Sequence, residues 1–181
     1  MKQQSGFTII ELVVVIILLG IMAATALPRF MDVSTEAHAS VVDGVQGGLQ
    51  SGMALYRAEW IAEGQADAST ADPDWGGLRV TAGGYPYGLV DNSVTRDDIV
   101  NTADCSAIFS NVLQAGAPSI TAVAAVANVV DVGTDFATHV NNTDDCLYYY
   151  TAETSSSGST VPTLAYDSET GQISLSTAAL P

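Results

Sequence analysis

A nearly unbroken apolar run near the N-terminus constrains this chain more than any other feature. From Phe7 to Leu27 the sequence holds a single charged side chain, Glu11. About twenty apolar residues form a helix long enough to cross a hydrocarbon layer roughly 30 Å thick. A carboxylate inside such a helix costs on the order of 3 kcal/mol, so we interpret Glu11 as a functional residue. The sequence therefore predicts a membrane-spanning helix over residues 7–27.

The residues before this run differ from a secretory signal peptide. In a signal peptide the cleavage site follows the apolar run, whereas here the cleavable junction, Gly6-Phe7, precedes it. The sequence Gly6-Phe7-Thr8-Ile9-Ile10-Glu11 resembles the processing motif of type IV pilins. In that family a membrane peptidase cuts after the glycine and methylates the new N-terminal residue. The resemblance implies a cleaved leader over residues 1–6 and a mature chain that begins at Phe7.

The same resemblance implies roles in assembly for Phe7, Glu11, Gly20 and Pro28. Gly20 and Pro28 fall where pilins interrupt the helix. Inside a filament, Glu11 is expected to pair with the Phe7 amine of a neighbouring subunit, because each charge would be costly alone in an apolar core. A subunit docked at the wrong height would leave both charges unpaired, so Glu11 would set the register. The alternative is an ordinary membrane anchor with a stray glutamate.

The charge of the chain disfavours two classes of partner. Five basic and twenty acidic residues give a net charge of −15, and Lys2 is the only lysine. Nucleic acid and anionic lipid both require basic patches, so neither is expected as the main partner beyond the helix. We interpret the acidity as a solvated surface suited to a salty medium. Cation binding is the alternative, at the acidic groups Asp72-Pro73-Asp74, Asp97-Asp98 and Asp144-Asp145, but none has the spacing of a calcium loop.

The two cysteines indicate an exported domain. Lys2 precedes the apolar run, and the positive-inside rule keeps it in the cytoplasm, so the chain after the run is translocated. In an oxidising compartment Cys105 and Cys146 are expected to form a disulfide. Closing that loop stabilises the fold by roughly 4 kcal/mol in the chain-entropy model. A metal site is disfavoured because the two histidines, His38 and His139, lack metal-ligand spacing.

Residues 28–63 are predicted to form an amphipathic helix. Pro28 is expected to interrupt or kink the helix, and Gly64 provides a C-terminal stop. Apolar residues recur at steps of three or four, the period of one helical face. This stripe consists of Phe30, Val33, Ala37, Val41, Val45, Leu49, Met53, Tyr56 and Trp60.

A strip of small residues lies beside the apolar stripe. Gly44, Gly48 and Gly52 recur every four residues. A glycine inside a helix costs about 1 kcal/mol relative to alanine, so the strip requires a compensating gain. Close approach of another backbone supplies one. Two occupants remain open: the sheet of the same chain, or helices and domains of neighbouring subunits.

The rest of the chain is predicted to complete an α+β domain. Residues 64–98 form a connecting region with brief strands near 78–80 and 85–90. Residues 99–181 form an antiparallel sheet with a short helix and the disulfide, laid on the long helix. The short helix is expected over 98–114, with Asp97 or Asp98 as its N-cap. Residues 120–132 are ambiguous between strand and helix, and we favour a strand. Further strands are expected at 146–151, 163–166 and 172–176, the last two joined in a hairpin with Gly171 at the turn.

Aromatic residues in the connecting region invite two interpretations. Trp75 and Tyr85-Pro86-Tyr87 could contact a ligand, but we favour lids over the core. The sequence holds no phosphate-binding glycine loop, no nucleophile elbow and no metalloprotease motif. We therefore predict that the protein is not an enzyme and needs no cofactor.

A finer resemblance concerns the region after Pro28. The glycine-rich helix, the two cysteines bracketing the sheet and the C-terminal hairpin resemble the mannose-sensitive haemagglutinin (MSHA) pilins of aquatic Gram-negative bacteria. This resemblance implies a major pilin that polymerises into a homo-oligomeric surface fibre for attachment, biofilm formation or related motility. It also implies a precursor in the inner membrane, a prepilin peptidase/methyltransferase and an inner-membrane assembly machinery as partners. The alternatives are a pseudopilin of a type II secretion system, acting as a periplasmic piston, and a minor pilin.

Overall fold

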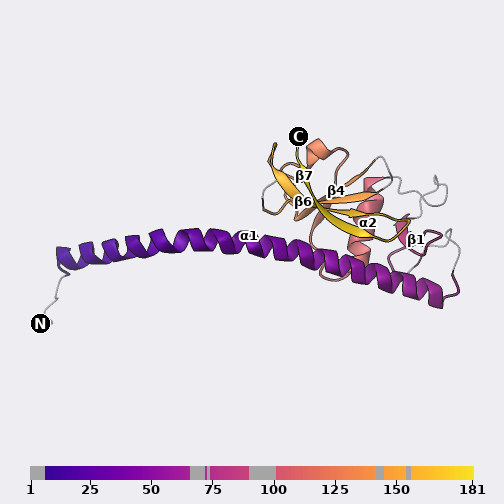
Figure 1. The fold of residues 1–181 in the computed structure, drawn as a ribbon, viewed down its shortest axis with the longest axis horizontal. Helices are drawn as coiled ribbons and strands as arrows, with labels where there is room; N and C mark the ends of the chain where they lie inside the picture. The colour runs from indigo at the N-terminus through magenta and orange to yellow at the C-terminus, as the bar shows by residue number, and fades with distance from the viewer. Residues whose placement is uncertain (1–6, 66–71, 73, 90–100, 142–144, 154–155) are drawn as a thin grey trace, which may run out of the picture. The chain divides into compact units, whose positions relative to one another are not determined.

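The computed structural model describes residues 7–65, 72, 74–89, 101–141, 145–153 and 156–181, without the side chains of residues 31 and 32. The chain divides into two compact units, Met1–Ser40 and Val41–Pro181. Within the described residues it forms two α-helices, one 3₁₀ helix and seven strands (Figure 1). In chain order these are α1 (Ile9–Ala62), β1 (Leu78–Val80), β2 (Pro86–Leu89), α2 (Thr102–Leu113), β3 (Ile120–Ala122), η1 (Val126–Val129), β4 (Phe136–Val140), β5 (Cys146–Tyr150), β6 (Thr160–Tyr166) and β7 (Ile173–Ala179).

Helix α1 contributes to both units and runs for 54 residues through Pro28. Of the two predicted effects of Pro28, an interruption or a kink, the interruption is therefore wrong. A proline inside a helix costs about 3 kcal/mol, and the many uninterrupted turns on both sides outweigh this local loss. The predicted stop is confirmed: Gly64 has a φ of 85°, and the Gln65 N–H bonds the Trp60 carbonyl at 2.9 Å. This hydrogen bond gives a partner to a carbonyl that the end of the helix would otherwise leave without one.

Helix α2 begins later than the sequence predicted. Its N-cap is Asn101, whose side chain accepts from the N–H groups of Ala103 at 2.8 Å and Asp104 at 3.1 Å. The Asp104 carboxylate returns the interaction by accepting from the Asn101 N–H at 3.3 Å. This reciprocal capping box fixes the helix start, so the prediction of a cap at Asp97 or Asp98 is wrong. Those two residues lie outside the described residues.

The main sheet has five strands in the order β3-β4-β5-β6-β7. Its last four strands pair antiparallel, as predicted, and the β6–β7 hairpin turns at Gly171 with a φ of 69°. Strand β3 pairs parallel with β4, so the sheet is mixed rather than wholly antiparallel. A separate antiparallel pair, β1 and β2, occupies the connecting region, where brief strands were expected.

Residues 120–132 follow the strand prediction only at their start. Three residues form β3, and the Val123 N–H still bonds the Thr138 carbonyl at 2.9 Å. The chain then leaves the sheet and forms η1, because Val123 and Val129 bury themselves against Tyr149 and Val161 in a second, smaller apolar cluster. Burial on the face of the sheet thus overrides the β-branched composition of the segment.

The main core of the Val41–Pro181 unit lies between α1, α2 and the sheet. Helix α1 supplies a buried face, with every side chain at most 7% exposed, formed by Val42, Val45, Leu49, Met53 and Tyr56. The predicted stripe is confirmed from Val45 to Trp60 but wrong at its beginning, where Phe30, Val33, Ala37 and Val41 are exposed. The successive steps of four from Val33 to Val45 rotate the predicted stripe away from the buried face, whereas the step of three from Val42 to Val45 stays on it. Trp75 and Tyr87 are buried in the same core, as predicted for lids.

Candidate functional site

Helix α1 begins with a second capping box that involves the predicted functional carboxylate. Glu11 Oε2 accepts from the Thr8 N–H at 3.0 Å and from the Thr8 hydroxyl at 2.7 Å. The Glu11 N–H in turn donates to Thr8 Oγ1 at 3.3 Å. This reciprocal pair satisfies donors at the exposed helix start. The role of Thr8 was not predicted, although a threonine three residues before a glutamate is the usual signature of such a cap.

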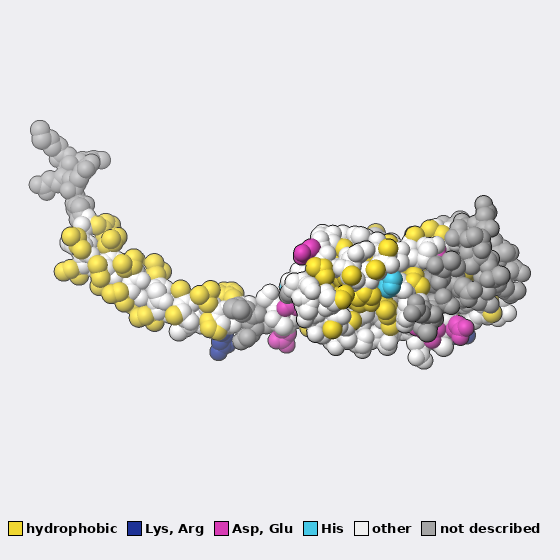
Figure 2. All heavy atoms as spheres, turned by 90° about the horizontal axis from the view of Figure 1, so that it is seen from above, with side chains coloured by type: hydrophobic (Ala, Val, Ile, Leu, Met, Phe, Trp, Pro, Cys, Tyr) yellow, Lys and Arg dark blue, Asp and Glu magenta, His cyan; other side chains and the backbone are white. Residues whose placement is uncertain are grey.

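The N-terminal part of α1 is an exposed apolar surface. Figure 2 shows hydrophobic side chains along its length. Leu18 within it is 52% exposed, and Phe7, just before the helix, is 86% exposed. Its most apolar 18-residue window has a mean hydropathy of 2.7, and none of that window is buried within the chain. By length and composition this helix can cross a membrane. Exposed apolar area of this extent requires lipid or another protein surface to cover it.

Two of the other proposed assembly residues, Gly20 and Pro28, lie in the same helix. A Cβ added at Gly20 would have nothing within 4 Å, so Gly20 leaves a small gap on the helix surface. Pro28 lies inside α1 without ending it. Phe7 is described and exposed, whereas Gly6, the residue before the predicted cleavage, lies outside the described residues.

The three glycines of the small-residue strip have different surroundings. A Cβ on Gly52 would lie 2.5 Å from Val112 Cγ1 and 2.9 Å from the Val112 carbonyl oxygen. A Cβ on Gly48 would lie 2.9 Å from Leu113 Cδ2, the movable end of a side chain. Gly44 has nothing within 4 Å. The close partner of this strip is thus the end of α2 rather than the sheet, and Gly44 is the position left open.

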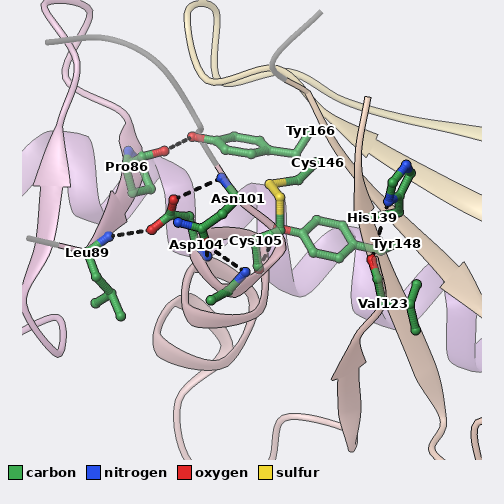
Figure 3. The surroundings of a disulfide bond; sticks show 11 residues. Pro86, Leu89, Asn101, Asp104, Cys105, Val123, His139, Cys146, Tyr148 and Tyr166 are labelled. Carbon is green, nitrogen blue, oxygen red and sulfur yellow. Dashed lines mark hydrogen bonds between the residues drawn. A yellow bond between two sulfur atoms is a disulfide. The ribbon is translucent and has the colours of Figure 1, made fainter. Parts of the chain in front are cut away.

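The predicted disulfide between Cys105 and Cys146 is present, and both cysteines are fully buried. It joins α2 to β5, with Cα atoms 5.4 Å apart and a sequence separation of 41. Figure 3 shows Tyr148 beside it, whose hydroxyl donates to the Cys105 carbonyl at 3.1 Å. Complete burial of the Tyr148 ring raises the pKa of its phenol well above the usual value. The disulfide therefore lies within the buried core, where solvent does not reach it.

Asp104 connects the elements around the disulfide. Its side chain is 5% exposed, and Oδ1 accepts from the Leu89 N–H at 3.1 Å while Oδ2 accepts from Asn101 (Figure 3). Gly88, with a φ of 154°, allows this approach because a Cβ there would lie 2.7 Å from Asp104 Oδ1. The role of Asp104 was not predicted, since its partner Leu89 is fifteen residues away and no local pattern joins the two residues.

No group of three or more histidine, cysteine or acidic side chains capable of holding a metal ion occurs in the described part of the chain. Asp72 caps a turn, accepting from the Asp74 N–H at 2.9 Å. The acidic pairs at residues 97–98 and 144–145 lie wholly or partly outside the described residues. His139 approaches the Val123 carbonyl with Nδ1 at 3.3 Å, a contact that holds the segment after β3 to the sheet.

Comparison with known proteins points to one family. The family model described as the prokaryotic N-terminal methylation motif matches residues 1–27. The type IV narrow pilus major component of Thermus thermophilus is 33% identical over 93 residues, which cover 51% of this chain and 77% of that protein. A fimbrial protein of Moraxella nonliquefaciens is 31% identical over 102 residues, covering 55% of this chain and 64% of its own.

A relative with another role also matches. The type II secretion system core protein G of Pseudomonas aeruginosa is 36% identical over 61 residues, which cover 34% of this chain and 43% of that protein. The chain thus spans less than two thirds of the Moraxella and Pseudomonas proteins. No solved structure matches the chain at a significant level. The methylation motif and the coverage of the Thermus pilus component together show that this chain belongs to the type IV pilin family, whose members are structural subunits and not enzymes.

Proposed function

We propose that this chain is the major, repeating subunit of a type IV pilus. The observation that carries the proposal is the exposed apolar surface of α1 with one carboxylate, Glu11, near its start. Burying a leucine, isoleucine, valine or phenylalanine side chain contributes about 1.5–3 kcal/mol. Before assembly the inner membrane covers this surface, and in the fibre neighbouring copies of the same helix cover it.

The capped start of α1 supports a specific role for Glu11. Both Thr8 bonds go to Oε2, which leaves Oε1 to accept from another subunit. Cleavage after Gly6 would retain Thr8 and therefore the cap. The new Phe7 amine of a neighbouring copy is the cation that would pair with Glu11, and a misplaced subunit would bury both charges unpaired.

Processing and export complete the proposal. A prepilin peptidase/methyltransferase removes residues 1–6, and an inner-membrane assembly machinery extracts the subunit into an extracellular fibre. The match of the methylation motif to residues 1–27 supports the processing step. Gly20, Pro28 and the open Gly44 are proposed as positions where the helices of neighbouring subunits meet.

The proposal is tested by shearing cells and determining the N-terminus of the chain in the released fibres by mass spectrometry. We expect an abundant fibre subunit that begins at methylated Phe7. Glu11→Gln should strongly reduce fibre yield, whereas Glu36→Gln, which removes an exposed carboxylate from the same helix, should not. A fibre subunit that still begins at Met1, or normal fibres from Glu11→Gln, would contradict the proposal.

Within the pilins we propose an MSHA-like fibre used for attachment and biofilm formation. The disulfide, the glycine-rich part of α1 and the β6–β7 hairpin support this assignment. Purified fibres should agglutinate red blood cells, and free mannose should inhibit the agglutination. Agglutination that mannose leaves unchanged would remove the MSHA assignment and leave the pilin proposal intact.

The second candidate is a pseudopilin of a type II secretion system, favoured by the match to core protein G. Deleting the gene separates the two roles. Loss of secreted enzymes with unchanged surface fibres would favour the pseudopilin, and loss of fibres with normal secretion would favour the pilin. A minor pilin would instead be present in fibres at a small fraction of the total subunit.

A further inference from the structure

Strand β7 leaves a long hydrogen-bonding edge open. It is the last strand of the sheet and pairs with β6 along its whole length without a register shift. The Asp167 N–H donates to the Gln172 carbonyl, and the Leu180 N–H donates to the Ser159 carbonyl. Because hydrogen-bonded positions alternate along an antiparallel pair, the backbone N–H and C=O groups of the even-numbered residues of β7 point toward β6. The backbone groups of Ile173, Leu175, Thr177 and Ala179 therefore point away from the sheet.

Helix α1 protects only the beginning of this edge. The Gln46 and Gln50 side-chain amides both approach the Ile173 carbonyl at 3.5 Å. Beyond that point most of the strand is exposed, and Leu175 is 44% exposed. Within the described part of the chain no other strand pairs with Leu175, Thr177 or Ala179.

The other strand edges carry the features that normally prevent edge pairing. Strands β1 and β3 are three residues long, and β2 holds Pro86 and an irregular register with β1. Short length, proline and bulges are the usual protection, together with charge. Strand β7 has seven residues and contains none of these features. An edge of this kind accepts another extended strand through main-chain hydrogen bonds.

Charge favours a second copy of this chain as the partner strand. The chain carries a net charge of −15, so two copies repel over most of their surfaces. Neither β6 nor β7 contains a charged residue. Two copies can therefore meet here without placing like charges directly opposite each other, which would destabilise the pair.

We propose that β7 pairs with β7 of a second copy in an antiparallel arrangement centred on Thr177. In this register Thr177 lies opposite itself and Leu175 lies opposite Ala179. Every backbone group left open between Leu175 and Ala179 gains a partner. The arrangement is two-fold symmetric and closes on itself, as isologous interfaces do.

This step rests on the proposed function: in a pilus subunit, the pairing of β7 with β7 links two fibres. Subunits of one polar fibre are related by a screw operation and cannot be related by a two-fold axis. Two copies paired through β7 must then belong to different fibres, so the edge is a site of lateral bundling.

A backbone substitution tests the pairing in sheared fibres. Thr177→Pro removes the outward N–H, and proline is tolerated where an edge strand faces solvent. Thr177→Val keeps the N–H and is the matched control. We expect Thr177→Pro to form single fibres and to reduce bundling about tenfold or more in electron micrographs and low-speed sedimentation, because each contact loses the two hydrogen bonds at its centre. Thr177→Val should bundle as the unsubstituted protein does.

Cross-linking tests the register independently of bundling. Thr177→Cys should be joined to a second copy by a short bismaleimide, since the two Cα atoms would lie about 5.5 Å apart. Ser174→Cys is the control on the same strand: six residues of offset place it roughly 20 Å from its counterpart. The measurement uses fibres and the full-length chain in detergent, read as dimers on denaturing gels.

The outcomes separate this inference from the proposed function. Equal bundling of Thr177→Pro, absence of bundles in the unsubstituted fibres, or equal cross-linking at residues 174 and 177 would overturn the pairing. A cross-linked product whose mass is not twice that of the chain would show a different partner and also overturn it. If no fibres form at all, the proposed function fails, and the Thr177→Cys dimer in detergent still decides the inference.

Discussion

The two parts of helix α1 differ in how they arrange apolar residues, although they are one continuous helix. Residues 9–27 carry one charge, Glu11, are otherwise almost wholly apolar on every side, and are exposed within the chain apart from the half-buried Ala26. Residues 41–62 carry one buried face that packs into the core of their own unit. A helix that is apolar on all sides must be covered by lipid or other helices, whereas a helix with one apolar face can bury that face against its own domain. The width of the apolar surface thus indicates which kind of partner each part requires.

The largest expected effect concerns the disulfide between α2 and β5, which lies in the Val41–Pro181 unit together with the second part of α1. Replacing Cys105 and Cys146 together by serine should lower the free energy of unfolding by about 2–5 kcal/mol, because the unfolded chain regains the freedom of the closed loop. Denaturant unfolding of the full-length chain in detergent, followed by the fluorescence of the buried Trp75, measures this loss. Unsubstituted protein treated with reductant is the control. A loss below about 1 kcal/mol would show that the loop contributes little.

A pair of leucines tests the comparison directly. Leu49 is fully buried and Leu18 is 52% exposed. Leu49→Ala should destabilise the domain by about 2–5 kcal/mol through lost burial and a cavity. Leu18→Ala should leave the denaturation midpoint of the domain unchanged and lower fibre yield instead. Equal effects of the two substitutions on the midpoint would remove the distinction between the two parts of α1.

Two glycines of the strip separate the part of α1 that packs against its own domain from the part that is open, because Gly52 lies close to Val112 and a Cβ on Gly44 would have no neighbour within 4 Å. Gly52→Ala should cost about 1–3 kcal/mol, because the new methyl group meets the backbone of Val112 and not only a movable side chain. Gly44→Ala should raise the free energy of unfolding by about 0.5–1 kcal/mol, because alanine favours the helix more than glycine does and the new methyl group has no atom within 4 Å to clash with. Thermal unfolding of both variants in detergent measures the difference. If Gly44→Ala retains stability yet fails to form fibres, Gly44 belongs to the assembly surface.

The smallest expected effect is a dependence on pH within the domain. Asp135 Oδ2 accepts from the Ser119 hydroxyl at 2.6 Å and from the Ser119 N–H at 2.9 Å, and these bonds lower the pKa of Asp135. The stabilisation is therefore complete above the unfolded-state pKa of about 3.9 and is lost as the pH falls through the lower folded-state value. Asp135→Asn should reduce stability at neutral pH and flatten the acid side of the stability profile. An unchanged acid profile in denaturant titrations would show that the bonds are not retained in solution.

Local sequence signals predicted the elements whose determinants are close together. The two helical stretches on either side of Pro28, the stop at Gly64, the strand at residues 146–151 and the hairpin at Gly171 each depend on residues within a few positions. The disulfide was predictable because the chain has only two cysteines and its topology places them outside the cytoplasm. Strand β4 was missed, since its five residues show no clear alternation and gain their stability from β3 and β5 on either side.

The sequence by itself determined that this chain has an apolar N-terminal helix with one carboxylate, an amphipathic continuation and a cysteine pair able to close one loop. These properties follow from residue order, which fixes helical faces and charge positions without reference to distant contacts. The tertiary structure decided the parallel pairing of β3, the cap of α2 at Asn101, the contact of Gly52 with Val112 and the open edge of β7. The β3 pairing and the contact of Gly52 with Val112 join residues far apart in sequence, which only chain folding brings within a few ångströms. The cap of α2 depends on which of several neighbouring polar residues begins the helix, and the edge of β7 depends on the order of the strands in the sheet.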